Sequence, residues 1–104
     1  MRRGLGIALA LVLTAALPAG AATRVAVTDH VFGKTSLTVS KGAKVKWVWT
    51  GEEKHNVAVT TGPEQFRSPL QKQGVYKRVM RKKGVYQLVC TRHEPDMAMT
   101  LTVR

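Results

Sequence analysis

The chain has 104 residues, of which 17 are Lys or Arg and 6 are Asp or Glu, with a single cysteine and 44% hydrophobic residues. That length allows one domain, and the hydrophobic content is too high for a disordered chain. Together these values argue against a two-domain catalyst, a P-loop enzyme and a disulfide-dense mini-protein.

The start of the chain has the pattern of a secretory signal peptide. A basic beginning is followed by an uncharged stretch, residues 4–23, which is rich in Leu and Ala and ends in small residues. This pattern predicts a cleaved signal peptide at residues 1–22 and a domain at residues 23–104, with cleavage after Ala21 or Ala22. An uncleaved membrane anchor is the alternative. We therefore expect export to the periplasm, or to the cell envelope or extracellular space.

The rest of the chain predicts short strands. No segment keeps a helical period for three turns, whereas apolar and polar residues alternate and turn residues recur every eight to twelve positions. This pattern is typical of an all-β Greek-key sandwich with about seven to eight strands. Strands are expected at residues 24–28, 37–39, 44–49, 55–60, 75–81, 85–90 and 97–104. One helical turn is possible within residues 61–74, and residues 82–84 are interpreted as a hairpin turn.

Alternation along these strands predicts which side chains point into the core. His55 shares its parity with two valines, and Cys90 shares its parity with Tyr86 and a leucine, so both should point inward. Met97 and Met99 share the parity of two apolar residues in the last strand. The side chains that can bind a metal are therefore expected at strand ends, facing the core.

Four side chains that can bind a metal form a set with a specific chemistry. His93 follows Cys90 by three positions, Met97 follows four later, and His55 comes from another strand. Two imidazoles, a thiolate and a weak thioether are the ligands of a blue-copper electron-transfer site. Zinc is the rival metal, and Met99 is the rival for the axial position. Taken singly, each residue is more simply a core side chain, and Cys90 could instead form an intermolecular disulfide.

These motifs make the sequence resemble the cupredoxins of the plastocyanin, amicyanin and pseudoazurin group. The resemblance covers nearly the whole mature chain, and the residues that carry it are His55-Asn56-Val57, Gly84-Val85-Tyr86-Gln87-Leu88-Val89-Cys90, Cys90-Thr91-Arg92-His93 with Met97, and the last strand Met99-Thr100-Leu101-Thr102-Val103. It implies one type 1 copper ion that cycles between Cu(I) and Cu(II), with ligands His55, Cys90 and His93 and with Met97 as the axial ligand. It also implies a hydrogen bond between Asn56 and Thr91, and an exposed edge of His93 through which the electron passes.

Other residues receive structural interpretations. Tyr86 lies where Greek-key sandwiches often carry a corner tyrosine that bonds to nearby backbone. Trp47 and Trp49 are expected in the core by parity. His30 is expected at the surface or at a strand edge, and it is not predicted to be a ligand.

The positive charge has several readings. After cleavage at Ala22 the domain has 15 basic and 6 acidic residues, a net charge of +9. Export argues against nucleic acid as a partner, although the charge alone would suggest it. We expect a monomer that is steered toward redox proteins with an acidic docking surface. A merely solvated basic face and peripheral association with anionic envelope surfaces are the alternatives.

Three functions remain open at this point. The first is an exported copper protein that carries single electrons between redox partners and is not an enzyme. The second is a copper carrier or storage protein without a role in electron transfer. The third is a β-sandwich interaction module in which Cys90 is a buried thiol.

Overall fold

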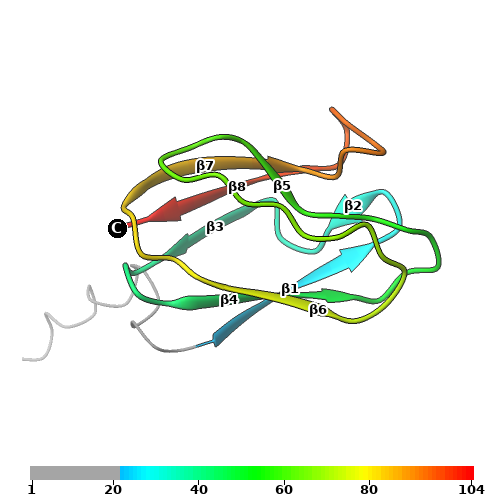
Figure 1. Ribbon diagram of the computed structural model, residues 1–104, viewed down its shortest axis with the longest axis horizontal. Helices are drawn as coiled ribbons and strands as arrows, with labels where there is room; N and C mark the ends of the chain where they lie inside the picture. The colour runs from blue at the N-terminus through cyan, green and yellow to red at the C-terminus, as the bar shows by residue number, and fades with distance from the viewer. Residues whose placement is uncertain (1–21) are drawn as a thin grey trace, which may run out of the picture.

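Two four-stranded sheets pack face to face in the computed structural model, which describes residues 22–104 (Figure 1). The predicted signal peptide lies outside the described residues apart from Ala22. The strands are β1 (Ala22–Thr28), β2 (Val31–Phe32), β3 (Ser36–Val39), β4 (Lys44–Trp49), β5 (Ala58–Thr61), β6 (Val75–Val79), β7 (Gly84–Val89) and β8 (Ala98–Val103). The predicted all-β sandwich is confirmed.

The strand order interleaves distant parts of the chain. One sheet has the order β2-β1-β4-β6 and the other β3-β8-β7-β5. The β1–β4 and β3–β8 pairs are parallel, and the remaining pairs are antiparallel. Because parallel neighbours need crossover connections, the chain passes repeatedly from one sheet to the other. Loops from both sheets therefore meet at each end of the sandwich.

The core lies between the sheets and follows the predicted alternation. Burial alternates along β4 and again along β8, so every second side chain reaches the interior. Trp47 is fully buried, and its ring packs against Phe66 and Tyr76 at centroid distances of 6.1 and 5.9 Å. Trp49 is also buried, which confirms the core positions predicted for both tryptophans.

Three local predictions are wrong. Residues 82–84 are not a hairpin turn, because β6 and β7 belong to different sheets and this segment carries the chain between them. Residues 61–74 contain no helix; two isolated bridges instead pair Gln71 with His55 and Arg67 with Ala58. The strand expected at residues 55–60 begins only at Ala58. Polar turn residues mark where a strand ends but not which strand follows as its neighbour.

The described part of the chain contains no helix long and apolar enough to cross a membrane.

The corner tyrosine gives a test of the fold. Tyr86 is fully buried, and its hydroxyl donates a hydrogen bond of 2.8 Å to the backbone carbonyl of Lys82, as predicted. Tyr86→Phe keeps the ring and removes this bond, so the free energy of unfolding should fall by about 1 kcal/mol. Thermal unfolding should show a decrease of about 4–8 °C for a domain of this size.

Tyr76→Phe is the matched control, because the hydroxyl of Tyr76 bonds to no described residue. Its unfolding temperature should stay close to that of the wild type. Equal losses in the two variants would show that the Tyr86 hydrogen bond does not stabilise the corner.

Candidate metal centre

The predicted ligands lie in loops at one end of the sandwich. His55 precedes β5 and forms an isolated bridge with Gln71, while Cys90 follows β7 directly. His93 and Met97 lie in the loop between β7 and β8, drawn in orange at the right of Figure 1, near the β1–β2 turn. Residues from both sheets are thus brought together at this end.

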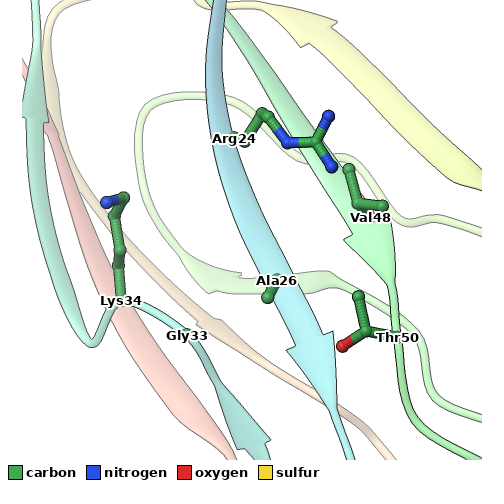
Figure 2. A pocket seen from close by; sticks show the side chains of 6 residues that line it. All are labelled: Arg24, Ala26, Gly33, Lys34, Val48 and Thr50. Carbon is green, nitrogen blue, oxygen red and sulfur yellow. The ribbon is translucent and has the colours of Figure 1, made fainter.

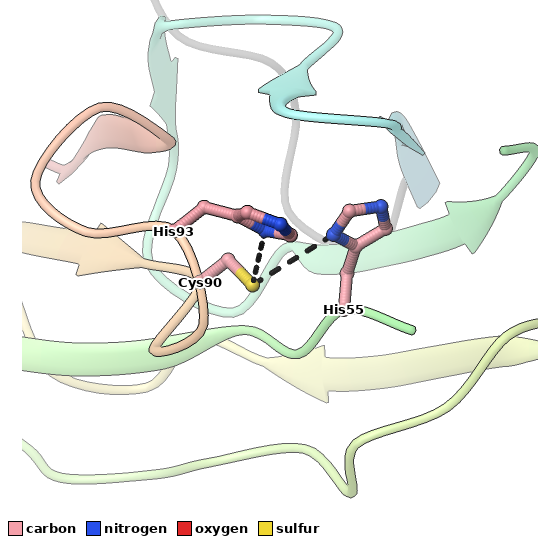
Figure 3. A group of neighbouring side chains, drawn as sticks. All are labelled: His55, Cys90 and His93. Atoms are coloured by element: carbon pink, nitrogen blue, oxygen red, sulfur yellow. Dashed lines mark hydrogen bonds between the residues drawn. The ribbon is translucent and has the colours of Figure 1, made fainter. Parts of the chain in front are cut away.

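Two ring nitrogens face the cysteine sulfur. Nδ1 of His55 lies 3.8 Å from Sγ of Cys90, and Nδ1 of His93 lies 3.6 Å from the same atom (Figure 3). Metal–nitrogen bonds of about 2.0 Å and metal–sulfur bonds of about 2.3 Å add to more than either distance, so one ion can reach all three atoms. The donor atoms therefore fit a single metal ion.

Burial differs among the ligand candidates. His55 and Cys90 are fully buried, whereas the side chain of His93 keeps 17% of its surface exposed. Cys90 has no disulfide partner, and it is the sole cysteine of the chain. The thiol is therefore available to a metal, and solvent reaches the group only at His93.

The loop that carries Met97 closes back on Cys90. The amide of Cys90 donates to the carbonyl of Met97 at 3.0 Å, and the amide of Met97 donates to the carbonyl of His93 at 3.1 Å. The Met97 side chain is fully buried. Met99 is also buried, but it lies within β8 opposite Leu88. The backbone thus ties Met97, but not Met99, to the loop of Cys90 and His93.

His55 is held on three sides. Its backbone exchanges two hydrogen bonds with Gln71, and its carbonyl also accepts a bond of 3.0 Å from the indole of Trp49. Its Nε2 lies 2.8 Å from Oδ1 of Asp29. A carboxylate accepts, so Nε2 carries the hydrogen and Nδ1 keeps a lone pair toward Cys90. The fold therefore sets both the position and the tautomer of this imidazole.

Asp29 also fixes the loop before His55. Its carboxylate accepts from the backbone amides of Glu52 and Glu53 at 2.9–3.0 Å. The bond from His55, then those from the two amides, lower the pKa of Asp29 from 3.8 to about 2. The carboxylate therefore stabilises the fold above pH 3.8, and this contribution is lost as the pH falls toward 2. Any side chain at Gly51 would collide with the carboxylate, so the close approach requires glycine.

A side-chain amide joins the two loops that carry the ligands. Oδ1 of Asn56 accepts from the backbone amide of Thr91 at 2.8 Å, and Nδ2 of Asn56 donates to the Thr91 hydroxyl at 3.0 Å. This is the contact that the resemblance implied. It couples the residue after His55 to the residue after Cys90 and so holds these two side chains in a fixed relation.

Sequence reasoning missed the role of Asp29. It stands 26 positions before His55, in a turn that looked like an ordinary polar connection. Nothing local distinguishes it, because its partners are brought to it only by the parallel pairing of β1 with β4. His30 is exposed, as expected for a surface residue, but its ring lies 4.3 Å from that of His93.

The link between the loops can be tested without metal. Asn56→Ala leaves the Thr91 amide without its partner, so the free energy of unfolding of the metal-free protein should fall by about 1–3 kcal/mol. Thr91→Val removes only the hydroxyl and keeps that amide, so its cost should be smaller. Urea unfolding of both variants measures the difference. Equal costs would contradict the role given to the bond between Asn56 and the Thr91 amide.

Comparison with known proteins points in the same direction. The profile of the copper binding proteins, plastocyanin/azurin family, matches residues 19–104. Comparison with curated protein sequences finds no match. Among solved structures, the chain is similar to an oxidized amicyanin mutant, with 23% identity over 79% of this chain and 81% of the other and a TM-score of 0.70. It is similar as well to the reduced Cu(I) form of another amicyanin mutant at pH 4, with 25% identity over 80% and 82% and a TM-score of 0.71.

The profile covers more than half of the chain and all of the loops described above. The chain belongs to the copper-binding proteins of the plastocyanin/azurin family, and copper is its cofactor.

Proposed function

We propose that this protein carries single electrons between redox partners. The observation that carries the proposal is the convergence of the His55 and His93 nitrogens on the Cys90 sulfur at one end of the sandwich. When bound, copper supplies a one-electron couple between Cu(I) and Cu(II). Thiolate and thioether suit Cu(I), and imidazole suits both states.

Four residues are proposed to hold the ion. His55 and His93 would bind through Nδ1, Cys90 through Sγ, and Met97 weakly through its thioether. Support for Met97 over Met99 comes from the backbone bonds that tie Met97 to the ligand loop and from the place of Met99 within β8. A site filled by four protein ligands leaves no open position for a substrate, so we propose that the protein is not an enzyme.

The constraint on the ligands favours electron transfer over copper delivery. His55 is held by Gln71, Trp49 and Asp29, and the Asn56 side chain couples its loop to the loop of Cys90. A ligand set that cannot relax keeps one geometry in both oxidation states, which lowers the cost of moving an electron. Delivery needs the opposite property, because buried ligands would have to open before the ion could leave. A carrier or storage role is the second candidate, and the ligand set alone does not distinguish it.

Charge is distributed unevenly over the molecule. Arg24, Lys46 and Lys77 lie side by side across β1, β4 and β6, by register of the three strands. A hollow on the outer face of β1 and β4 is lined by Arg24 and also by Lys34 (Figure 2). We propose that this basic face steers the protein toward acidic surfaces of redox partners, an effect that salt should screen. Anionic envelope surfaces are the alternative target.

The electron is proposed to pass at the exposed edge of His93. Among the ligand candidates within residues 22–104, it alone has a partly exposed side chain. A partner that docks at this end lies next to His93, so the electron does not have to cross the core of the sandwich.

Export to the periplasm or cell envelope remains a proposal that rests on residues 1–22. A single unpaired cysteine is unusual in an exported chain, and a role as a metal ligand accounts for it.

Colour tests the proposed ligands directly. Adding Cu(II) to the metal-free protein should produce an intense blue or green colour, because the Cys90 thiolate donates charge to copper. Cys90→Ser keeps the size of the side chain but should give no such band. Copper should also stay bound through repeated reduction and reoxidation. Stoichiometric binding without colour would overturn the proposed site, and loss of copper on reduction would favour delivery.

Asp29 should tune the reduction potential. Asp29→Asn keeps the shape of the side chain and removes a negative charge that bonds to His55 and favours Cu(II). The reduction potential should therefore rise, on the order of 60 mV for a tenfold change in the one-electron equilibrium. Voltammetry measures the shift.

Glu64→Gln is the charge-matched control, because it also removes one negative charge but Glu64 pairs with Arg78 and not with a proposed ligand. The same shift in both variants would mean that Asp29 acts only through net charge.

A further inference from the structure

A second group of metal-binding side chains lies on the surface beside the first. The two oxygens of the Glu53 carboxylate face different histidines: Oε2 lies 3.3 Å from Nε2 of His30, and Oε1 lies 3.6 Å from Nε2 of His93. The donor atoms of the three residues all lie within 4.8 Å of one another. Imidazole and carboxylate together bind borderline divalent ions such as Cu²⁺ and Zn²⁺.

His93 belongs to both groups through different atoms. Its Nδ1 faces the Cys90 sulfur at 3.6 Å, and its Nε2 faces Glu53. In a neutral imidazole only one nitrogen has a free lone pair, so the ring binds an ion on one side at a time. The inner and outer groups are therefore alternatives that share one side chain.

The outer group is held in place by Asp29. The carboxylate of Asp29 accepts from the backbone amide of Glu53, which fixes the start of that side chain. His30 follows Asp29 directly and has a positive φ of 70°, a conformation in which histidine is found more often than most residues. The same carboxylate thus positions His55 for the inner group and Glu53 beside His30 for the outer one.

The local charge at this end favours a cation. Five of the six acidic residues of the chain lie in the three loops around the site, namely Asp29, Glu52, Glu53, Glu94 and Asp96. The same loops carry two basic residues, Lys54 and Arg92. A chain that is strongly basic elsewhere is therefore acidic here, and a divalent ion is attracted to this end.

We propose that His30, Glu53 and Nε2 of His93 form an outer site that captures a divalent copper or zinc ion while the inner site is empty. Because His93 is shared, only its imidazole ring separates an ion in the outer site from the inner group with Cys90. When Nδ1 of His93 binds an ion in the inner site, the outer site loses His93 as a ligand. The inference rests on the proposed function for the identity of the inner site. The simpler alternative is an exposed ion pair between His30 and Glu53 with no affinity for metal.

Zinc binding tests the outer site with the inner thiolate removed. In a Cys90→Ser background, calorimetric titration with Zn²⁺ should detect one site whose affinity falls by about tenfold or more in Glu53→Gln and in His30→Asn. Asparagine is chosen because it tolerates the positive φ at this position. Glu52→Gln, which removes a neighbouring carboxylate with no place in the group, should bind as the background does.

Two results would overturn the outer site. One is the absence of Zn²⁺ binding, and the other is equal affinity in Glu53→Gln and Glu52→Gln, which would leave Glu53 as an ordinary surface charge.

Copper uptake by the otherwise unaltered protein gives an independent test. At low Cu²⁺ concentration, stopped-flow mixing with metal-free protein should show slower development of the inner-site spectrum in Glu53→Gln and His30→Asn, with the same final spectrum. Glu52→Gln should load at the wild-type rate. Uptake rates that are the same in all four proteins would overturn capture by the outer site.

The two proposals fail in different ways. If copper binds without colour, the inner site is wrong, while the zinc titration still decides the outer one. If the colour develops normally and neither zinc affinity nor uptake rate depends on His30 and Glu53, only the outer site is wrong.

Discussion

The arrangement of the candidate metal centre depends on one carboxylate that is not among the proposed ligands. Asp29 accepts hydrogen bonds from three donors: the ring of His55 and the backbone amides of Glu52 and Glu53. These bonds join the β1–β2 turn to the loop before β5. Hydrogen bonds to a charged acceptor are stronger than those to a neutral one. Loss of the carboxylate would therefore free the imidazole and the loop together.

The strands and the inward ligands could be predicted because each depends on local pattern. Alternation placed His55 and Cys90 inward, and both are fully buried, although His55 precedes β5 in a segment, residues 55–59, that is buried throughout. The pairing of Asn56 with Thr91 came instead from a resemblance, and the contact is present. The predictions that failed depend on non-local contacts. Residues 82–84 look like any polar turn in sequence, yet they connect two sheets. Asp29 could not be found either, because its partners are 23 to 26 positions away and meet it only in the folded chain.

A hydrogen bond connects the hydrophobic core to the candidate metal site. Trp49 ends β4 in the interior, and its indole bonds to the carbonyl of His55. This bond ties the sheet of β4 to His55, while the other sheet carries Cys90 directly after β7. The ligands keep their relative positions only if the two sheets keep theirs. The core between the sheets supplies that constraint, because Trp47 of one sheet and Tyr86 of the other both pack against Phe66.

The parallel pairing of β3 with β8 has a consequence for the chemistry of the thiol. These strands lie more than sixty positions apart, so pairing them costs more chain entropy than the local pairing of β7 with β8. Before the sandwich forms, Cys90 is a free thiol, open to oxidation to a sulfenic acid or to a mixed disulfide. If the chain is exported as proposed, its only cysteine is protected from oxidants once the sandwich has buried it.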